Sequence, residues 1–360
     1  MKIYPYIYEP DKSLEVYKKT KKYLSKNPKV MERIEELGWV YHNVGMIIPH
    51  NYDNLWSGHF FPFSDSWDEL QISFNLCCFG LYKQAFVSLR SGLELGLLSV
   101  YYNINDEGHK TVQDWYNSKQ TDEANTPRAN KIWNILLSNP NIKQFNDKHD
   151  LRKKFDQLGY LHNFVHTKGY EYSNRVGTFK SNFQTLEVFI LEKWLLSYAE
   201  IVSLISTLHL LKYPISVIRY DYGKKFGIDI PSFGGLEEFN INKIAKILPN
   251  GYMSDIEAIA IKDPQTQTTI NEIIAMPDMT GDEIEDQIIS MEKSLIEHGV
   301  GFTKWLEQQE SNLKLFKMIE FDEAMLNRID KLRKWAVENN FIEPIDIRLG
   351  WDKKYPSKKK

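Results

Sequence analysis

The order of hydrophobic and polar residues favours helices throughout the first 212 residues of the chain. Proline at position 28 interrupts the first polar stretch, because proline lacks a backbone donor and fits best at a helix start. Tyr213-Pro214 ends the last apolar stretch for the same reason. The pattern predicts helices over residues 11–38 (one or two, broken near Asn27-Pro28), 66–102, 126–137, 150–169 and 182–212.

Three short segments have the spacing of a helix capping box. In each, a Ser or Thr stands three residues before a Glu or Gln, so that each side chain can satisfy a free backbone amide at the start of a helix. The segments are 66–69, 181–184 and 280–283. They predict helix starts at these three places.

The composition changes after Pro214, where glycine and proline interrupt an irregular stretch. Residues 256–261 and 269–275 have the Ile-rich composition of two strands, and the polar segment 263–265 between them predicts a β-hairpin. Helices are expected over 280–299, 303–319 and 321–339. The predicted fold class is therefore mainly α, with a C-terminal small α+β unit that contains the β-hairpin.

These patterns divide the chain into four regions. They are residues 1–65 (helices and an aromatic loop), 66–213 (a helical bundle), 214–345 (the α+β accessory unit) and 346–360 (a basic tail). The aromatic loop over residues 52–67 contains many rings but no Lys or Arg. It can cover the bundle as an apolar plug or stack on bases, since aromatic platforms bind single strands.

The overall charge excludes a protein that coats nucleic acid through bulk electrostatics. The chain of 360 residues has 45 Lys and Arg against 48 Asp and Glu, a formal charge of −3. Hydrophobic residues make up 42%, which is enough for a large core and excludes a mainly disordered chain. Five lysines of the first helix form a basic cluster, which favours either a solvated face or contact with RNA or an acidic partner: Lys18, Lys19, Lys21, Lys22 and Lys26.

Nothing in the sequence predicts secretion or membrane insertion. The start of the chain lacks the apolar region of a signal peptide. The apolar segment 194–211 is interrupted by Glu200 and several hydroxyl side chains, which favours a buried helix over a membrane span. Cys77 and Cys78 lie in an apolar run and are expected to act as small hydrophobic residues. We therefore expect a cytoplasmic protein with no membrane partner.

The helix over residues 66–102 contains the first candidate site. Ser88, Gly92 and Gly96 recur every four residues and predict a stripe along which a second helix packs closely. Between Gln84 and Asn105 the only charged residues are Arg90 and Glu94, which lie one turn apart. They form either a solvent-facing ion pair or a charged pair inside the bundle that holds a ligand or a partner helix.

Two histidines supply the second candidate site. His162 and His166 are four residues apart and therefore share one face near a helix C-terminus, where the dipole favours the protonated ring. Three interpretations remain open: core or capping histidines, a pair that binds phosphate or transfers protons, and a zinc pair. The last needs further ligands, and the sequence contains no HExxH motif and no Cys/His cluster.

The segments 85–94, AFVSLRSGLE, and 161–166, LHNFVH, resemble the helices of HEPN-superfamily proteins, most closely uncharacterised bacterial members. The resemblance covers about residues 66–212. It implies an up-and-down helical bundle, frequent homo-oligomers or protein partners from the same system, and RNA or a nucleotide as ligand. Many members cleave RNA without metal in toxin or antiviral defence systems. No cofactor is implied.

The resemblance also implies roles for individual residues. His166 matches the family's catalytic histidine, but no arginine in the chain has a histidine four to six residues downstream, as the nuclease members do. Arg90 and His162 would then supply the missing role, with Glu94 in support. The candidate binding residues beside them are Tyr101, Asn163 and Lys168.

The resemblance therefore implies a HEPN-like effector of a prokaryotic defence or toxin-type stress system that is a divergent metal-independent ribonuclease. The alternative is a non-catalytic sensor or scaffold that binds a protein, nucleotide or RNA. A third class, a metal-dependent hydrolase, requires metal bound at His162 and His166.

Overall fold

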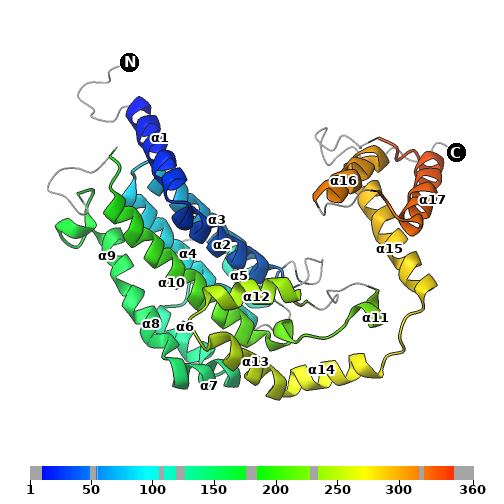
Figure 1. Cartoon of the computed structure of the whole chain (residues 1–360). Helices are drawn as coiled ribbons and strands as arrows, with labels where there is room; N and C mark the ends of the chain where they lie inside the picture. The colour runs from blue at the N-terminus through cyan, green and yellow to red at the C-terminus, as the bar shows by residue number, and fades with distance from the viewer. Residues whose placement is uncertain are drawn as a thin grey trace. The chain divides into compact units, whose positions relative to one another are not determined.

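The structure is a computed structural model that describes residues 10–48, 54, 56–104, 109–118, 126–175, 185–227, 234–315 and 320–343. Every regular element in these ranges is a helix, which confirms a mainly α fold (Figure 1). The described residues form two compact units. One is drawn from Met1–Tyr220 and Ile230–Ile274, and the other from Asp221–Asp229 and Ala275–Lys360.

The first unit contains most of the helices. They are α1 (Pro10–Lys26), α2 (Pro28–Gly45), α3 (Phe61–Cys78), α4 (Tyr82–Ile104), α5 (Lys110–Tyr116), α6 (Ala129–Leu136), α7 (Pro140–His149), α8 (Leu151–Gln157), α9 (Leu161–His166), α10 (Val188–Lys212), α12 (Glu238–Ile247), α13 (Tyr252–Lys262) and α14 (Pro264–Ala275). Short 3-10 turns occupy Leu158–Tyr160, Tyr170–Tyr172 and Pro214–Val217. The predicted break at Asn27-Pro28 and the end of α10 before Tyr213-Pro214 are confirmed.

The predicted helix over 66–102 is two antiparallel helices, α3 and α4. The chain reverses at Gly80, whose φ of +75° is a backbone conformation that glycine adopts without strain. A Cβ at this position would lie 2.7 Å from the Thr185 carbonyl oxygen. The Ser73 hydroxyl donates to the Ala85 carbonyl at 2.7 Å, across the two helices. Apolar periodicity continues through the reversal because both helices are buried along their lengths, so the sequence pattern missed the turn.

The capping box predicted at 66–69 is wrong, because Ser66 lies inside α3. Its buried hydroxyl donates to the Gly92 carbonyl at 2.6 Å and contacts the Tyr41 hydroxyl at 2.6 Å. The helix starts earlier, at Phe61, with proline in its first turn. The serine is therefore engaged in tertiary contacts rather than with a helix end. The segment 181–184 lies outside the described residues.

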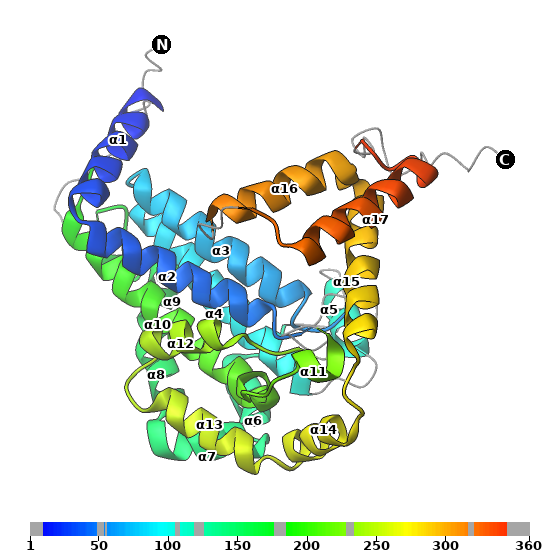
Figure 2. The same cartoon turned by 45° about the vertical axis from the view of Figure 1, so that its right-hand side comes forward.

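The expected stripe of small residues along α4 is confirmed. A Cβ on Gly92 would lie 3.0 Å from the Leu70 side chain of α3. A Cβ on Gly96 would lie 2.9 Å from Ile205 of α10 and 3.0 Å from the Tyr41 hydroxyl of α2. Figure 2, like Figure 1, shows α3, α4 and α10 side by side. The stripe thus places α4 between α3 and α10, in the middle of the core.

The β-hairpin is wrong, and its two predicted strands lie in the helices α13 and α14. The buried side chains Ile256, Ile259 and Ala260 follow the helical spacing of three and four residues, which a six-residue window does not distinguish from alternation. The polar segment between them is a helix start. Asp263 accepts the Thr266 amide at 2.8 Å, and Pro264 begins α14.

Several polar contacts attach the segment after Pro214 to the helices before it. The Trp39 indole donates to Asn240 at 3.2 Å, and Asn141 donates to Asp263 at 2.8 Å. His149 lies 2.6 Å from Asp255. Hydrogen bonds from Lys148 and His149 hold the pKa of the Asp255 carboxyl below its usual value. Residues of α12 and α13 therefore belong to the first unit.

The second unit consists of α11 (Gly223–Phe226), α15 (Gly281–Leu295), a π-helical turn (Ile296–Val300), α16 (Gly301–Leu315) and α17 (Glu323–Asn339). The capping box predicted at 280–283 is confirmed: the Glu283 amide donates to the Thr280 hydroxyl at 3.3 Å, and the Thr280 amide donates to Glu283 at 2.7 Å. Side chains of α15, α16 and α17 form a small core of their own, which includes Ile289, Trp305 and Leu332.

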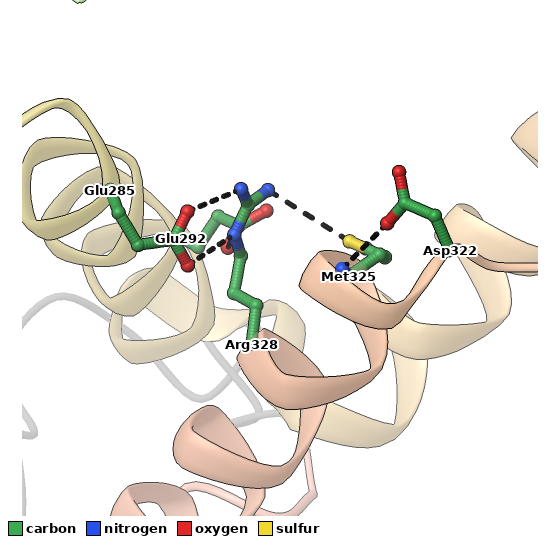
Figure 3. Close-up of polar contacts among 5 residues, drawn as sticks. All are labelled: Glu285, Glu292, Asp322, Met325 and Arg328. Atoms are coloured by element: carbon green, nitrogen blue, oxygen red, sulfur yellow. Dashed lines mark hydrogen bonds and ion pairs between the residues drawn. The ribbon is translucent and has the colours of Figure 1, made fainter. Parts of the chain in front are cut away.

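An arginine joins two helices of the second unit (Figure 3). Arg328 of α17 donates to both oxygens of Glu285 on α15, at 3.1 and 2.7 Å. Its Nε also lies 3.9 Å from Glu292, whose pKa is raised chiefly by burial. At the start of α17, Asp322 accepts the Met325 amide at 2.8 Å. A bidentate ion pair of this kind fixes the orientation of α15 and α17 as well as their separation.

Two further expectations concern the core and the membrane. Cys77 and Cys78 are free and buried, and burial raises the pKa of the Cys78 thiol to about 12, so both remain neutral thiols in the core. Among the described residues, no helix combines the length and the apolar character that crossing a bilayer requires.

Substitution Gly96→Ala tests the close packing of α4. The added methyl group meets Ile205 and Tyr41 at distances that force them to move, a penalty of about 1–3 kcal/mol that outweighs the roughly 1 kcal/mol gained in helix propensity. We expect a lower free energy of unfolding in chemical denaturation. Gly159→Ala is the control, because a Cβ there has no neighbour within 4 Å. Equal stability of the two variants would contradict this prediction.

Candidate functional site

A pair of stacked rings holds α9 against α4. The buried rings of Phe86 and Phe164 stack with centroids 4.4 Å apart and an interplanar angle of 10°. Arg90 lies one turn after Phe86 on α4, and His162 and His166 lie on either side of Phe164 on α9. The packing of the two helices therefore brings the two sequence-predicted sites together into one cluster.

Arg90 and Glu94 form an ion pair on α4. The Arg90 side chain is only 15% exposed, whereas the Glu94 side chain is 52% exposed. The Arg90 Nε atom is buried and has no hydrogen-bond partner in the part of the chain that the structure describes. The arginine is thus anchored and partly desolvated, while its carboxylate partner lies largely in solvent.

The two histidines of α9 lie side by side. Their ring centroids are 4.2 Å apart, with an interplanar angle of 58°. The pKa of His162 is lowered by desolvation first, then by the positive charges of His166, Arg90 and Lys168, while Glu94 opposes them. His162 therefore stays neutral to lower pH than a free histidine. Because each of these residues acts on His162, five charged or titratable groups of α4 and the end of α9 form one cluster.

The end of α9 has an unusual backbone. Thr167 has φ of 48°, a left-handed conformation that is strained for a β-branched residue. Its hydroxyl accepts a hydrogen bond from the Lys83 ammonium of α4 at 2.7 Å. The Lys168 amide donates to the Asn163 carbonyl at 3.1 Å and closes the helix end. A contact from α4 therefore helps hold the strained turn that follows His166.

The three predicted binding residues have different positions. Lys168 is exposed and belongs to the cluster, and Asn163 lies between the two histidines and takes part through its backbone. Tyr101 is 5% exposed and packs edge-on against Tyr102 with ring centroids 5.2 Å apart. It lies about two helical turns beyond Glu94, so the structure does not bring it to the cluster.

Lys83 is a residue of this region that the sequence pattern did not reveal. It stands seven residues before Arg90, which puts both on the same side of α4. This spacing is visible in the sequence, but Lys83 follows the reversal at Gly80, which the predicted continuous helix concealed. Lys83 adds a cation beside the turn that ends α9.

A second group of polar side chains lies in the core and was also missed. His59 precedes α3 and His209 lies in α10, and their Nδ1 atoms are 3.2 Å apart. His59 Nε2 lies 2.8 Å from the Gly45 carbonyl, and His209 Nε2 lies 2.8 Å from the Ser99 hydroxyl. Since a carbonyl only accepts, His59 donates from Nε2. The Ser99 hydroxyl also lies 2.7 Å from the Gly96 carbonyl, so its single proton serves either that carbonyl or His209 Nε2.

In the part of the chain that the structure describes, no three His, Cys, Asp or Glu side chains are arranged to hold a metal ion. His162 and His166 therefore have no third protein ligand of these types among the described residues. A scan of family models, a search of curated proteins and a search of solved structures each found no match to the chain.

The buried histidine predicts a pH-dependent stability. Burial, and then the adjacent His59, lower the pKa of His209 well below 6.5, so the unfolded chain binds a proton that the folded chain does not. The free energy of unfolding should therefore fall as the pH drops below about 6.5, by about 1.4 kcal/mol per pH unit for this proton.

Chemical denaturation over a series of pH values checks this expectation. His209→Gln removes the group that binds this proton, so the free energy of unfolding should fall less steeply below pH 6.5 than in the wild type. His42→Gln is the control, because His42 is exposed. The same slope in the wild type and in His209→Gln would show that His209 is not the group responsible.

Proposed function

We propose that the protein is a HEPN-like effector of a prokaryotic defence or toxin-type stress system, and that the cluster on α4 and α9 binds and cleaves RNA without a metal ion. One observation carries the proposal. Arg90 comes from a segment about 70 residues before His162 and His166, and the charges of Arg90 and His166 both lower the pKa of His162, while α4 packs on α9 through Phe86 and Phe164. Arginine binds the phosphate of a phosphodiester, and histidines transfer protons when it is cleaved.

The proposed reaction assigns a role to each group. Neutral His162 accepts the proton of a ribose 2′-hydroxyl, and the 2′-oxygen forms a bond to phosphorus. His166 donates a proton to the 5′-oxygen as its bond to phosphorus breaks, which gives a 2′,3′-cyclic phosphate and a free 5′-hydroxyl. Arg90 stabilises the charge that develops on the phosphoryl oxygens, and Lys168 attracts the adjacent phosphate. Glu94 holds the guanidinium in place when no RNA is bound.

The ion pair between Arg90 and Glu94 favours one alternative. A guanidinium already paired with a carboxylate binds phosphate more weakly than a free one, because the two anions compete. Such a site suits a non-catalytic sensor or scaffold that binds RNA, a nucleotide or a protein. The two functions differ in whether replacing the histidines abolishes a reaction or only weakens binding.

Cleavage of a labelled single-stranded RNA by the full chain, in the presence of EDTA, tests the proposal. We expect Arg90→Ala and His166→Ala to lower the rate by about 100-fold or more, because a positioned acid or base typically contributes about 10²–10⁴. A substrate with a 2′-deoxyribose at the cleaved position should be inert. His42→Ala is the control, because this exposed histidine lies on α2.

The pH profile provides a second measurement. Since the Arg90 charge lowers the pKa of His162, Arg90→Ala should move the acidic limb of the profile toward higher pH as well as slow the reaction. Equal cleavage by the wild type and the Arg90→Ala/His166→Ala double variant would end the enzyme proposal. Loss of RNA binding in that variant without any cleavage by the wild type would support the sensor instead.

A further inference from the structure

A cavity of about 340 Å³ lies in the first unit, at the junction of α1, α2 and α3. Pockets that bind small molecules have volumes of about 300–1,000 Å³, so this one suits a small ligand. Thr20 fixes one wall: its buried hydroxyl bonds to the Cys78 carbonyl at 3.1 Å and ties α1 to the end of α3. The cavity shares no residue with the cluster on α4 and α9.

The inner wall of the cavity is apolar. Leu24 and Cys78 are 7% and 6% exposed, and Met31 and Phe74 are half-buried beside them. Burial raises the pKa of the Cys78 thiol to about 12, so the thiol is neutral and contributes as an apolar surface. An apolar body of a ligand would therefore replace water that the wall binds poorly.

The outer wall supplies the positive charge of Lys21 and the amide of Asn75, while the Ser25 hydroxyl already donates to the Lys22 carbonyl at 3.0 Å. Lys21, Ser25 and Asn75 are exposed residues of the lining, and no Asp or Glu lines the cavity. Within the described residues, neither the Lys21 ammonium nor the Asn75 side-chain amide has a hydrogen-bond or ion-pair partner. Tyr17, which stacks on Phe79 with ring centroids 5.2 Å apart, brings its phenol to the same rim.

We propose that this cavity binds a small carboxylate amphiphile, with the apolar body against the inner wall and the carboxylate at Lys21 and Asn75. A carboxylate is the group that matches an unpaired ammonium beside an unpaired amide donor, since it only accepts hydrogen bonds. An uncharged apolar molecule would leave the ammonium without a counter-ion, and a ligand with a positive head would be repelled. This assignment is independent of the proposed ribonuclease activity.

The structure contains a reporter for binding. Phe74 in the cavity wall stacks on the Trp194 indole, with ring centroids 5.5 Å apart and an interplanar angle of 28°. A ligand that contacts Phe74 should change the environment of this tryptophan. Titration of the full chain with decanoate, followed by calorimetry and tryptophan fluorescence, should therefore show saturable binding, with butyrate and decanol as weaker ligands.

Two variants and a matched control locate the site. Lys21→Met removes the charge but keeps the apolar stem, and should weaken decanoate binding about tenfold while leaving decanol binding unchanged. Lys22→Met is the control: it removes a charge from the next residue of α1, which does not line the cavity. Ser25→Phe fills the cavity from an exposed position and should abolish binding of both ligands.

The same experiments can overturn the proposal. Absence of saturable binding by both decanoate and 2-naphthoate, a linear and a flat carboxylate, would show that the cavity has no such ligand. Equal weakening in Lys21→Met and Lys22→Met would show that binding reflects the general charge of α1. Self-association of the wild-type chain that Ser25→Phe abolishes would show that a second copy occupies the cavity instead.

Discussion

The close approach of α4 to its neighbours is the constraint on which the rest of the first unit depends. Gly92 and Gly96 leave no space for a side chain, so α4 contacts α3 on one side and α10 and α2 on the other. Glycine costs helix propensity of about 1 kcal/mol at each position, and the dispersion attraction between the closely packed helices offsets this cost. The inner side of α4 carries Ser99, which contacts the buried His209, and the outer side carries Arg90, whose charge lowers the pKa of His162 on α9. The packing of the core therefore sets the geometry of the surface cluster.

The sequence predicts best where a local signal and the tertiary structure agree. Pro28 and Pro214 mark real helix boundaries because a proline restricts the backbone whatever its surroundings. Thr280 caps a helix at an exposed end, and its hydroxyl bonds to Glu283 within the capping box. Ser66 has the same local spacing but lies in the core, where the Gly92 carbonyl binds its hydroxyl instead. The two segments differ in burial, and a stretch of four residues does not show whether it will be buried.

Four residues of the cluster stood out in the sequence, but their arrangement did not. Arg90 and Glu94 stand out because they are the only charges in an apolar stretch, and His162 and His166 because of their spacing. The packing of the helices that carry these two pairs depends on the contact between Phe86 and Phe164, two of many apolar residues with no distinguishing signal. The buried pair of His59 and His209 was missed for the same reason, because its members lie 150 residues apart.

The difference in exposure between Arg90 and Glu94 determines what the cluster can bind. Charges in a partly desolvated setting interact more strongly than in water, so the buried guanidinium is the fixed partner and the exposed carboxylate the movable one. In the proposed function, an anion that reaches Arg90 competes with Glu94, and Lys168, whose charge also acts on His162, adds attraction. Adjacent phosphates of an RNA chain can contact Arg90 and Lys168 at the same time, whereas a single carboxylate contacts one of them. Under the proposed function, the cluster would therefore favour a polyanion over an isolated anion.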